Sequence, residues 1–113
     1  MSSASSKPVR GSTTGRPVMA LLDLLGRRMA LRIIWELRDG ARLTFRALQT
    51  AHATNPSVLN ARLGDLRAAA LVDHDGEGYG LTRLGGDLLE KVLPLHAWAE
   101  TWATQTSVKA KKN

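Results

Sequence analysis

Hydrophobic and polar positions recur with the period of an α-helix along most of the chain. Residues 17–25 are apolar on nearly every side, which predicts a short, buried helix that begins at Pro17 and stops at Gly26. The apolar positions within residues 27–38 predict a second helix that ends before Gly40. We expect this second helix to lie at the centre of the core.

Two short helices joined by a turn are predicted next. Thr44 is placed to cap a helix over residues 45–51, and Asn55 followed by Pro56 marks the start of a further helix at about residues 55–69. The apolar face of this further helix consists of Val58, Leu59, Leu63 and Leu66. Two short helices connected in this way form a helix-turn-helix unit.

The pattern then changes to that of a β-hairpin followed by a long helix. Residues 71–75 and 79–81 predict two strands around a glycine-containing turn. Thr82 is placed to cap the last helix, which we expect Pro94 to kink or to divide into two segments. A helix-turn-helix followed by a hairpin is a winged helix, so the predicted fold class is mainly α with a small β-hairpin.

The outward face of the helix at about residues 55–69 carries short, polar or cationic side chains. Asn and Arg form bidentate hydrogen bonds with adenine and guanine in the major groove, and a recognition helix contacts bases mainly through its N-terminal turns. The predicted base contacts are therefore Ser57, Asn60, Ala61 and Arg62. An ordinary amphipathic surface helix would show the same periodicity.

The formal charge of +6 is distributed unevenly along the chain. Residues 17–108 hold equal numbers of basic and acidic side chains, so the two ends carry the excess. Residues 27–67 nevertheless contain eight arginines against three acids, which predicts a positive field on one side, as phosphate contacts require. Solvated helix faces are the alternative explanation. The predicted phosphate contacts are Arg27, Arg28, Arg42, Arg46 and Arg67.

We expect one winged-helix domain at residues 17–103 between two basic ends. Residues 1–16 are rich in Ser, Thr and Gly, and residues 104–113 end in lysines, so both segments are expected to be disordered. A domain this small buries little surface, and oligomerisation commonly adds stability at this size. Trp98 and Trp102 lie four residues apart near its end, either in the core or against a second copy.

Composition argues against several classes of protein. The chain has no cysteine, which excludes disulfides, thiolate catalysis and cysteine metal sites. No apolar run is long enough to cross a bilayer and no hydrophobic signal core is present, so we expect a cytoplasmic protein. His52, His74 and His96 are not spaced as zinc ligands, and no glycine-rich phosphate loop is present. We expect neither enzyme activity nor a metal or cofactor.

A series of loose motifs becomes specific through its order and spacing. The motifs lie within residues 16–26, 31–40, 45–48, 59–66, 71–72 and 79–85. Through them, residues 16–102 resemble the HxlR-type transcriptional regulators, which are related to the MarR superfamily. The resemblance implies a dimeric winged helix whose terminal helices form the dimer interface and whose two subunits contact DNA half-sites. It places the interface at Val18, Leu21, Leu22, Leu95, Trp98 and Trp102.

The chain departs from the family pattern in two places that bear on function. Family members commonly carry a cysteine before the Pro-Val pair, used by some as a redox or electrophile sensor, and Arg16 occupies that place here. The predicted wing is several residues shorter than usual and carries Asp73, Asp75 and Glu77, which phosphate would repel. The basic ends of the chain are the expected substitute for wing contacts to DNA.

The sequence thus predicts a sequence-specific regulator of transcription that binds double-stranded DNA as a homodimer, with the helix at about residues 55–69 in the major groove. The alternative is a winged helix that serves as a protein-interaction module and binds DNA only non-specifically through its basic tail. A cavity between the terminal helices and the helix-turn-helix would be lined by Trp35, Trp98, Met19 and Met29. Core packing explains these four residues equally well, so no small-molecule effector is assigned.

Overall fold

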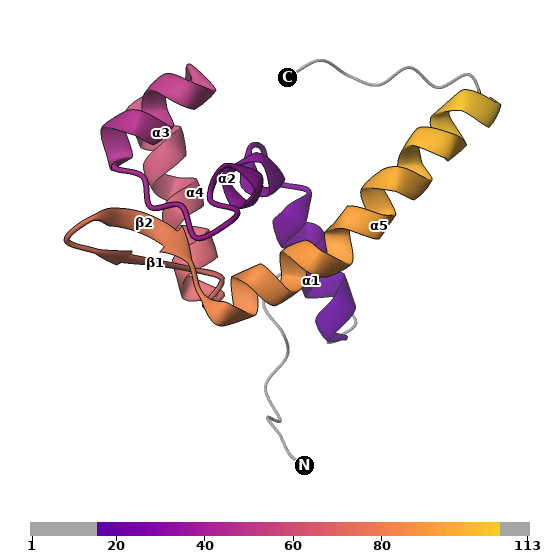
Figure 1. Cartoon of the computed structure of the whole chain (residues 1–113), viewed down its shortest axis with the longest axis horizontal. Helices are drawn as coiled ribbons and strands as arrows, with labels where there is room; N and C mark the ends of the chain where they lie inside the picture. The colour runs from indigo at the N-terminus through magenta and orange to yellow at the C-terminus, as the bar shows by residue number, and fades with distance from the viewer. Residues whose placement is uncertain (1–15, 107–113) are drawn as a thin grey trace, which may run out of the picture.

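The structure is a computed structural model that describes residues 16–106, and this part of the chain contains five helices and one hairpin (Figure 1). This order of elements confirms the predicted winged helix, mainly α with a small β-hairpin. The elements are α1 (Pro17–Leu25), α2 (Ala30–Glu36), α3 (Phe45–His52), α4 (Pro56–Ala68), β1 (Val72–Asp75), β2 (Gly78–Leu81) and α5 (Arg83–Thr106).

Three side chains cap helices as the sequence predicts. The Thr44 hydroxyl accepts a hydrogen bond of 3.0 Å from the Ala47 N–H at the start of α3. The side-chain oxygen of Asn55 accepts one of 2.9 Å from the Val58 N–H at the start of α4. Thr82 does the same for the Gly85 N–H at 2.9 Å. Each cap satisfies an N–H that has no partner within its own helix, so local chemistry sets these three starts.

The core lies around α2, as expected. Ile33 and Ile34 of α2 are fully buried, and they pack with the buried face of α4. That face consists of Leu59, Leu63 and Leu66, all at most 1% exposed. Burying a side chain of this size stabilises a fold by about 1.5–3 kcal/mol, so this cluster holds α4 in place.

The first helix differs from expectation in its burial. The sequence predicts that α1 is buried, but none of its residues is, and Val18 and Leu22 are 55% and 53% exposed. The reason is that α1 packs on the body through one face only, whereas its apolar residues surround the helix. Its end agrees with expectation, because Gly26 follows its last residue.

The second helix is shorter than predicted. It begins at Ala30, three residues later than position 27, because Met29 adopts a left-handed conformation with a φ of 71°. Arg27 and Arg28 therefore lie in a turn between α1 and α2 rather than on a helix.

The last helix runs without interruption from Arg83 to Thr106, so Pro94 does not divide it. Its C-terminal half projects away from the rest of the molecule (Figure 1). The helix passes residue 103, the expected end of the domain, by three residues. Apart from Arg16 and residues 104–106, the two basic ends predicted to be disordered lie outside the described residues.

The hairpin is a tight antiparallel pair in which Val72 lies opposite Leu81 and Asp75 opposite Gly78. Its turn is therefore the two residues between Asp75 and Gly78. Gly78 has a φ of 119°, and a Cβ there would collide with the backbone of Leu43. Leu43 exchanges two backbone hydrogen bonds with Tyr79, of 2.9 and 2.7 Å, which ties the hairpin to the segment before α3.

Candidate nucleic-acid interface

The helix α4 presents two distinct faces. Leu59, Leu63 and Leu66 point into the core, while a row of small and polar residues spaced three and four apart is exposed. We call this row the α4 stripe; it consists of Ser57, Asn60, Ala61 and Gly64. None of these residues is bulky, so the helix backbone can approach a partner closely along the stripe.

Arg62 does not lie on the α4 stripe. Its Nε donates a hydrogen bond of 2.7 Å to the carbonyl oxygen of Arg28, and its guanidinium forms an ion pair of 2.8 Å with Asp65. Its side chain is only 17% exposed. The structure therefore separates Arg62 from Ser57, Asn60 and Ala61 and makes it a bridge between α4 and the turn before α2.

The helical period of the sequence already indicates that Arg62 lies on a different side of α4 from the stripe. Residues two positions apart in an α-helix lie about 160° apart around its axis, so Asn60 and Arg62 occupy nearly opposite sides. Asp65, three residues after Arg62, also stands where it can pair with it. The prediction that Arg62 contacts bases took account of neither its angular position nor its spacing to Asp65.

Asp65 joins α4 to α1 through a second arginine. Arg27 lies 3.0 Å from Asp65 and 3.1 Å from Asp23 of α1. Partial burial acts to raise the pKa of Asp65, but hydrogen bonds from Arg27 and Arg62 and their positive charges outweigh it, and the pKa lies below its ordinary value. We call Asp23, Arg27, Arg62 and Asp65 the Asp65 network. Because of it, Arg27 is paired within the protein.

Arg42 is also paired within the protein, on the hairpin. Its guanidinium donates to Asp73 and, at 2.9 Å, to the carbonyl oxygen of Gly78, and it lies 3.3 Å from Asp75. The hydrogen bond with Asp73 is the main reason that the pKa of Arg42 lies above its ordinary value. Two of the three hairpin acids are thereby partly neutralised, and Arg42 braces the wing instead of pointing away from it.

Three of the predicted phosphate contacts keep exposed side chains. Arg28, Arg46 and Arg67 form no ion pair within residues 16–106. Arg46 lies on α3 and Arg67 near the end of α4, so both belong to the helix-turn-helix. These three are the arginines of the predicted set that remain available to an anionic partner.

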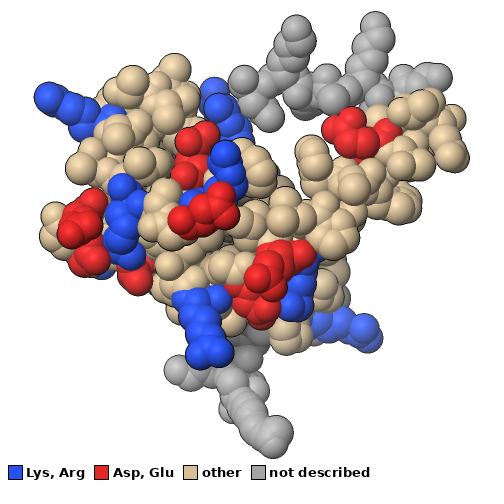
Figure 2. All heavy atoms as spheres, viewed as in Figure 1, with Lys and Arg blue, Asp and Glu red and all other residues tan. Residues whose placement is uncertain are grey.

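Ion pairs within the protein reduce the number of arginines that are free to contribute to the expected one-sided positive field. Of the eight arginines in residues 27–67, Arg27, Arg38, Arg42 and Arg62 pair with carboxylates. In the view of Figure 2, basic and acidic side chains lie beside one another over the body of the molecule. Local pairing, which a count along the sequence does not show, occupies four of these eight arginines within the protein.

Most of the residues predicted to form a dimer interface are exposed. Val18, Leu22, Leu95, Trp98 and Trp102 are 44–60% exposed, and we call them the terminal-helix surface. The rings of Trp98 and Trp102 stack with centroids 6.4 Å apart on the projecting half of α5. Leu21 differs, since it is half-buried and faces a cavity. Other large apolar side chains that were not predicted to lie in the interface are exposed as well: Met19, Leu31, Trp35, Leu84 and Leu93.

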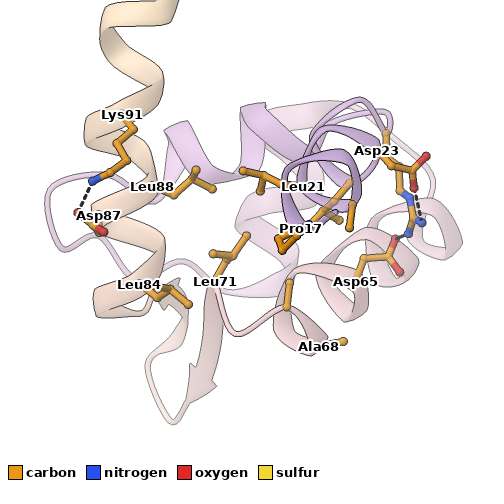
Figure 3. A pocket seen from close by; sticks show the side chains of 14 residues that line it. Pro17, Leu21, Asp23, Asp65, Ala68, Leu71, Leu84, Asp87, Leu88 and Lys91 are labelled. Carbon is orange, nitrogen blue, oxygen red and sulfur yellow. Dashed lines mark hydrogen bonds and ion pairs between the residues drawn. The ribbon is translucent and has the colours of Figure 1, made fainter. Parts of the chain in front are cut away.

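A cavity of about 510 Å³ lies between α1, α4 and α5 (Figure 3). Its walls are mostly aliphatic and include Leu21, Leu24, Leu71, Leu84 and Leu88. The four residues considered for a cavity from sequence, Trp35, Trp98, Met19 and Met29, do not line it.

Residues 16–106 contain no group of His, Cys, Asp or Glu side chains arranged to hold a metal ion. No helix in this range has the length and hydrophobicity required to cross a membrane.

Comparison with known proteins identifies similar structures but no matching family model and no curated relative. Quinone-bound YodB from B. subtilis is similar with a TM-score of 0.68 at 28% sequence identity, over 74% of this chain and 96% of YodB. A possible HxlR family transcriptional factor from Thermoplasma volcanium GSS1 is similar with a TM-score of 0.66 at 24% identity, over 79% of this chain and 86% of its own. The chain thus has the winged helix-turn-helix fold of the HxlR-type transcriptional regulators.

Proposed function

We propose that this chain is a transcriptional regulator that binds double-stranded DNA sequence-specifically as a homodimer, with α4 in the major groove. The observation that carries the proposal is the α4 stripe, a small-residue surface on a capped helix whose other face is locked into the core. The small side chains of such a helix allow it to enter the groove without steric hindrance. Because its other face is packed in the core, its polar side chains keep fixed positions relative to the base edges.

Base contacts are assigned to Ser57, Asn60 and Ala61. Asn60 is the residue of this set able to form a bidentate pair with adenine, and the two smaller residues allow it to approach. Arg62, paired with Asp65 on the protein side, is left out of the set. Arg28, Arg46 and Arg67 are the proposed phosphate contacts because they are exposed and have no ion pair within residues 16–106.

The proposed dimer uses the terminal-helix surface. Large apolar side chains at 44–60% exposure on two helices form a surface that monomeric proteins rarely leave in water. In Figure 2 the projecting half of α5 is mainly uncharged, which suits contact with a second copy. The hairpin has no proposed part in DNA binding, because its acids repel phosphate and Arg42 is occupied with them.

A protein-interaction module is the second candidate. It is favoured by the acidic hairpin and by the ion pairs that occupy four of the eight arginines in residues 27–67. In that case DNA binding would be non-specific and driven by the lysines at positions 109, 111 and 112.

Genomic fragments captured by the full chain at near-physiological salt and then sequenced distinguish the two candidates. We expect an enriched inverted repeat for the native chain and its loss for Asn60→Ala, because a lost bidentate pair costs about 1–3 kcal/mol of discrimination. Equal recovery of all fragments by both proteins would exclude sequence-specific binding and favour the interaction module.

Arginine variants separate phosphate contacts from base contacts in the same assay series. Arg67→Ala should weaken binding to every sequence alike and lower the slope of log K against log salt by about one. Arg42→Ala is the matched control and should leave the slope unchanged, since Arg42 is bound to the hairpin. A slope that changes equally in both variants would contradict the assignment.

A further inference from the structure

Arg62 and Asp65 lie between two parts of the proposed DNA site. Arg62 Nε donates a hydrogen bond of 2.7 Å to the carbonyl oxygen of Arg28, and Arg62 Nη1 lies 2.8 Å from the carboxylate of Asp65. One α4 side chain thus ties the helix of the α4 stripe to a proposed phosphate contact. We propose that Arg62 and Asp65 are positioning residues for DNA binding: without touching DNA, they hold Arg28 at a fixed place relative to the α4 stripe. This inference rests on the proposed function and deepens it.

The turn that carries Arg28 needs support from outside itself. It joins α1 to α2, and Met29 within it has a φ of 71°, a left-handed conformation that residues other than glycine rarely adopt. The Ala30 N–H donates to the Arg27 carbonyl at 3.1 Å across this turn. Such a local bond fixes the shape of the turn but not its position relative to α4. The hydrogen bond from Arg62 supplies that position.

Asp65 holds both arginines of the Asp65 network in place. Its carboxylate lies 2.8 Å from Arg62 and 3.0 Å from Arg27, the residue before Arg28. Arg27 also lies 3.1 Å from Asp23 of α1, and Figure 3 shows both of its ion pairs. A guanidinium whose donors are matched to fixed acceptors is held in one orientation. The Asp65 network therefore fixes α1, the turn and α4 relative to one another.

Direct contact between Arg62 and DNA is the competing interpretation, and the contacts of its side chain argue against it. This side chain is only 17% exposed, and it lies on nearly the opposite side of α4 from Asn60. To contact a base, Arg62 would have to leave the carbonyl of Arg28 and the carboxylate of Asp65, which would deprive both acceptors of their donor. Arg28 and Asn60, in contrast, are exposed. Positioning uses contacts that the protein already makes.

The salt dependence of binding to a random-sequence duplex tests the inference, because phosphate contacts form on any sequence. In the full chain, Arg28→Ala should reduce the magnitude of the slope of log K against log salt by about one. Arg62→Lys keeps the positive charge but loses the rigid fork that reaches both acceptors, so it should reduce the slope by the same amount. The double variant should also lose about one rather than about two, because both changes remove the same phosphate contact. A variant that is merely less stable keeps the native slope.

Amide hydrogen exchange of the free chain tests the positioning without DNA. The Ala30 N–H, which donates to the Arg27 carbonyl within the turn, should exchange at least threefold faster in Arg62→Lys and in Asp65→Asn than in the native chain. The Val58 N–H at the start of α4 should keep its native rate, because its cap does not involve the network. Faster exchange at the turn alone distinguishes a released turn from general unfolding.

Arg38→Lys is the matched control. Arg38 also donates to a backbone carbonyl, that of Trp35 at 3.1 Å, and pairs with a carboxylate, that of Asp39 at 3.7 Å, but it lies outside the Asp65 network. This variant should keep both the native slope and the native exchange rate in the turn.

Three results would overturn the inference. The first is a loss of about two in the slope of the double variant, which would mean that Arg28 and Arg62 contact phosphates independently. The second is a native slope in either single variant, and the third is native exchange at Ala30 in Arg62→Lys. If the expected slopes are found but the native chain enriches no sequence among genomic fragments, the proposed sequence-specific function fails and the positioning of Arg28 stands.

Discussion

His52, the last residue of α3, is a buried polar residue inside the helix-turn-helix. It is 7% exposed, and neither ring nitrogen has a hydrogen-bond partner within residues 16–106. A neutral imidazole carries one N–H, and a buried donor without an acceptor costs about 1–3 kcal/mol. Burial is the main cause that lowers the pKa of His52 below 6.5; the charge of Arg32 acts in the same direction and that of Glu36 against it.

The lowered pKa predicts a loss of stability in weak acid. The unfolded chain takes up a proton at His52 near its ordinary pKa of 6.5, whereas the folded chain does so only at lower pH. The contribution of His52 to stability is therefore complete above pH 6.5 and decreases as the pH falls below it. Urea unfolding midpoints at pH 7.5 and 5.5 should show this decrease in the native chain and a smaller one in His52→Leu.

The control for this prediction is His96→Gln, because the side chain of His96 is 72% exposed. It should keep the native pH dependence. An unchanged pH dependence in His52→Leu would show that other groups are responsible.

At the scale of elements, two adjacent glycines at the start of α5 have opposite surroundings. A Cβ on Gly85 would collide with the carbonyl oxygen of Leu71, in the segment that leads from α4 to the hairpin. A Cβ on Gly86 would meet no atom within 4 Å. Gly85 thus allows α5 to approach the end of α4 closely, and this approach places the α5 wall of the cavity.

The pair predicts opposite changes in stability. Gly85→Ala should lower the free energy of unfolding by about 1–3 kcal/mol, because backbone must move to relieve the collision. Gly86→Ala should raise it by up to about 1 kcal/mol, because alanine is the better helix former and its methyl group is unopposed. Urea titration of both variants measures the difference, and a loss of stability in Gly86→Ala as large as that in Gly85→Ala would contradict this account.

At the scale of the whole molecule, the core and the exposed tryptophans lie in different places. The core is built around α2 and α4, whereas Trp98 and Trp102 are 60% and 44% exposed on the half of α5 that projects from the body. The stacked tryptophans on this projecting half of α5 stabilise the protein only when another protein surface covers them. The proposed second copy supplies that cover.

Trp98→Glu tests the proposed dimer. We expect the native 12.3-kDa chain to have twice its monomer mass by sedimentation, and the variant to be largely monomeric because a buried, unpaired carboxylate is unfavourable in an interface. His96→Glu adds the same charge on the other side of α5 and should remain dimeric, since residues two apart lie about 160° apart around a helix. Dimers in both variants, or a monomeric native chain, would exclude this interface.

Local signals were sufficient to predict the order of elements, the three helix caps and the central position of α2, because each depends on residues close together in the chain. The opposite sides of Asn60 and Arg62 were also implied by the helical period. The partners of Arg27 and Arg42, the exposure of α1 and the position of the cavity required the tertiary structure. Asp65 lies more than thirty residues from Arg27, as Asp73 does from Arg42, and α1, α4 and α5 enclose a cavity only once they are packed. Contacts between distant segments follow from how the elements pack, and no local pattern of charge or hydrophobicity specifies them.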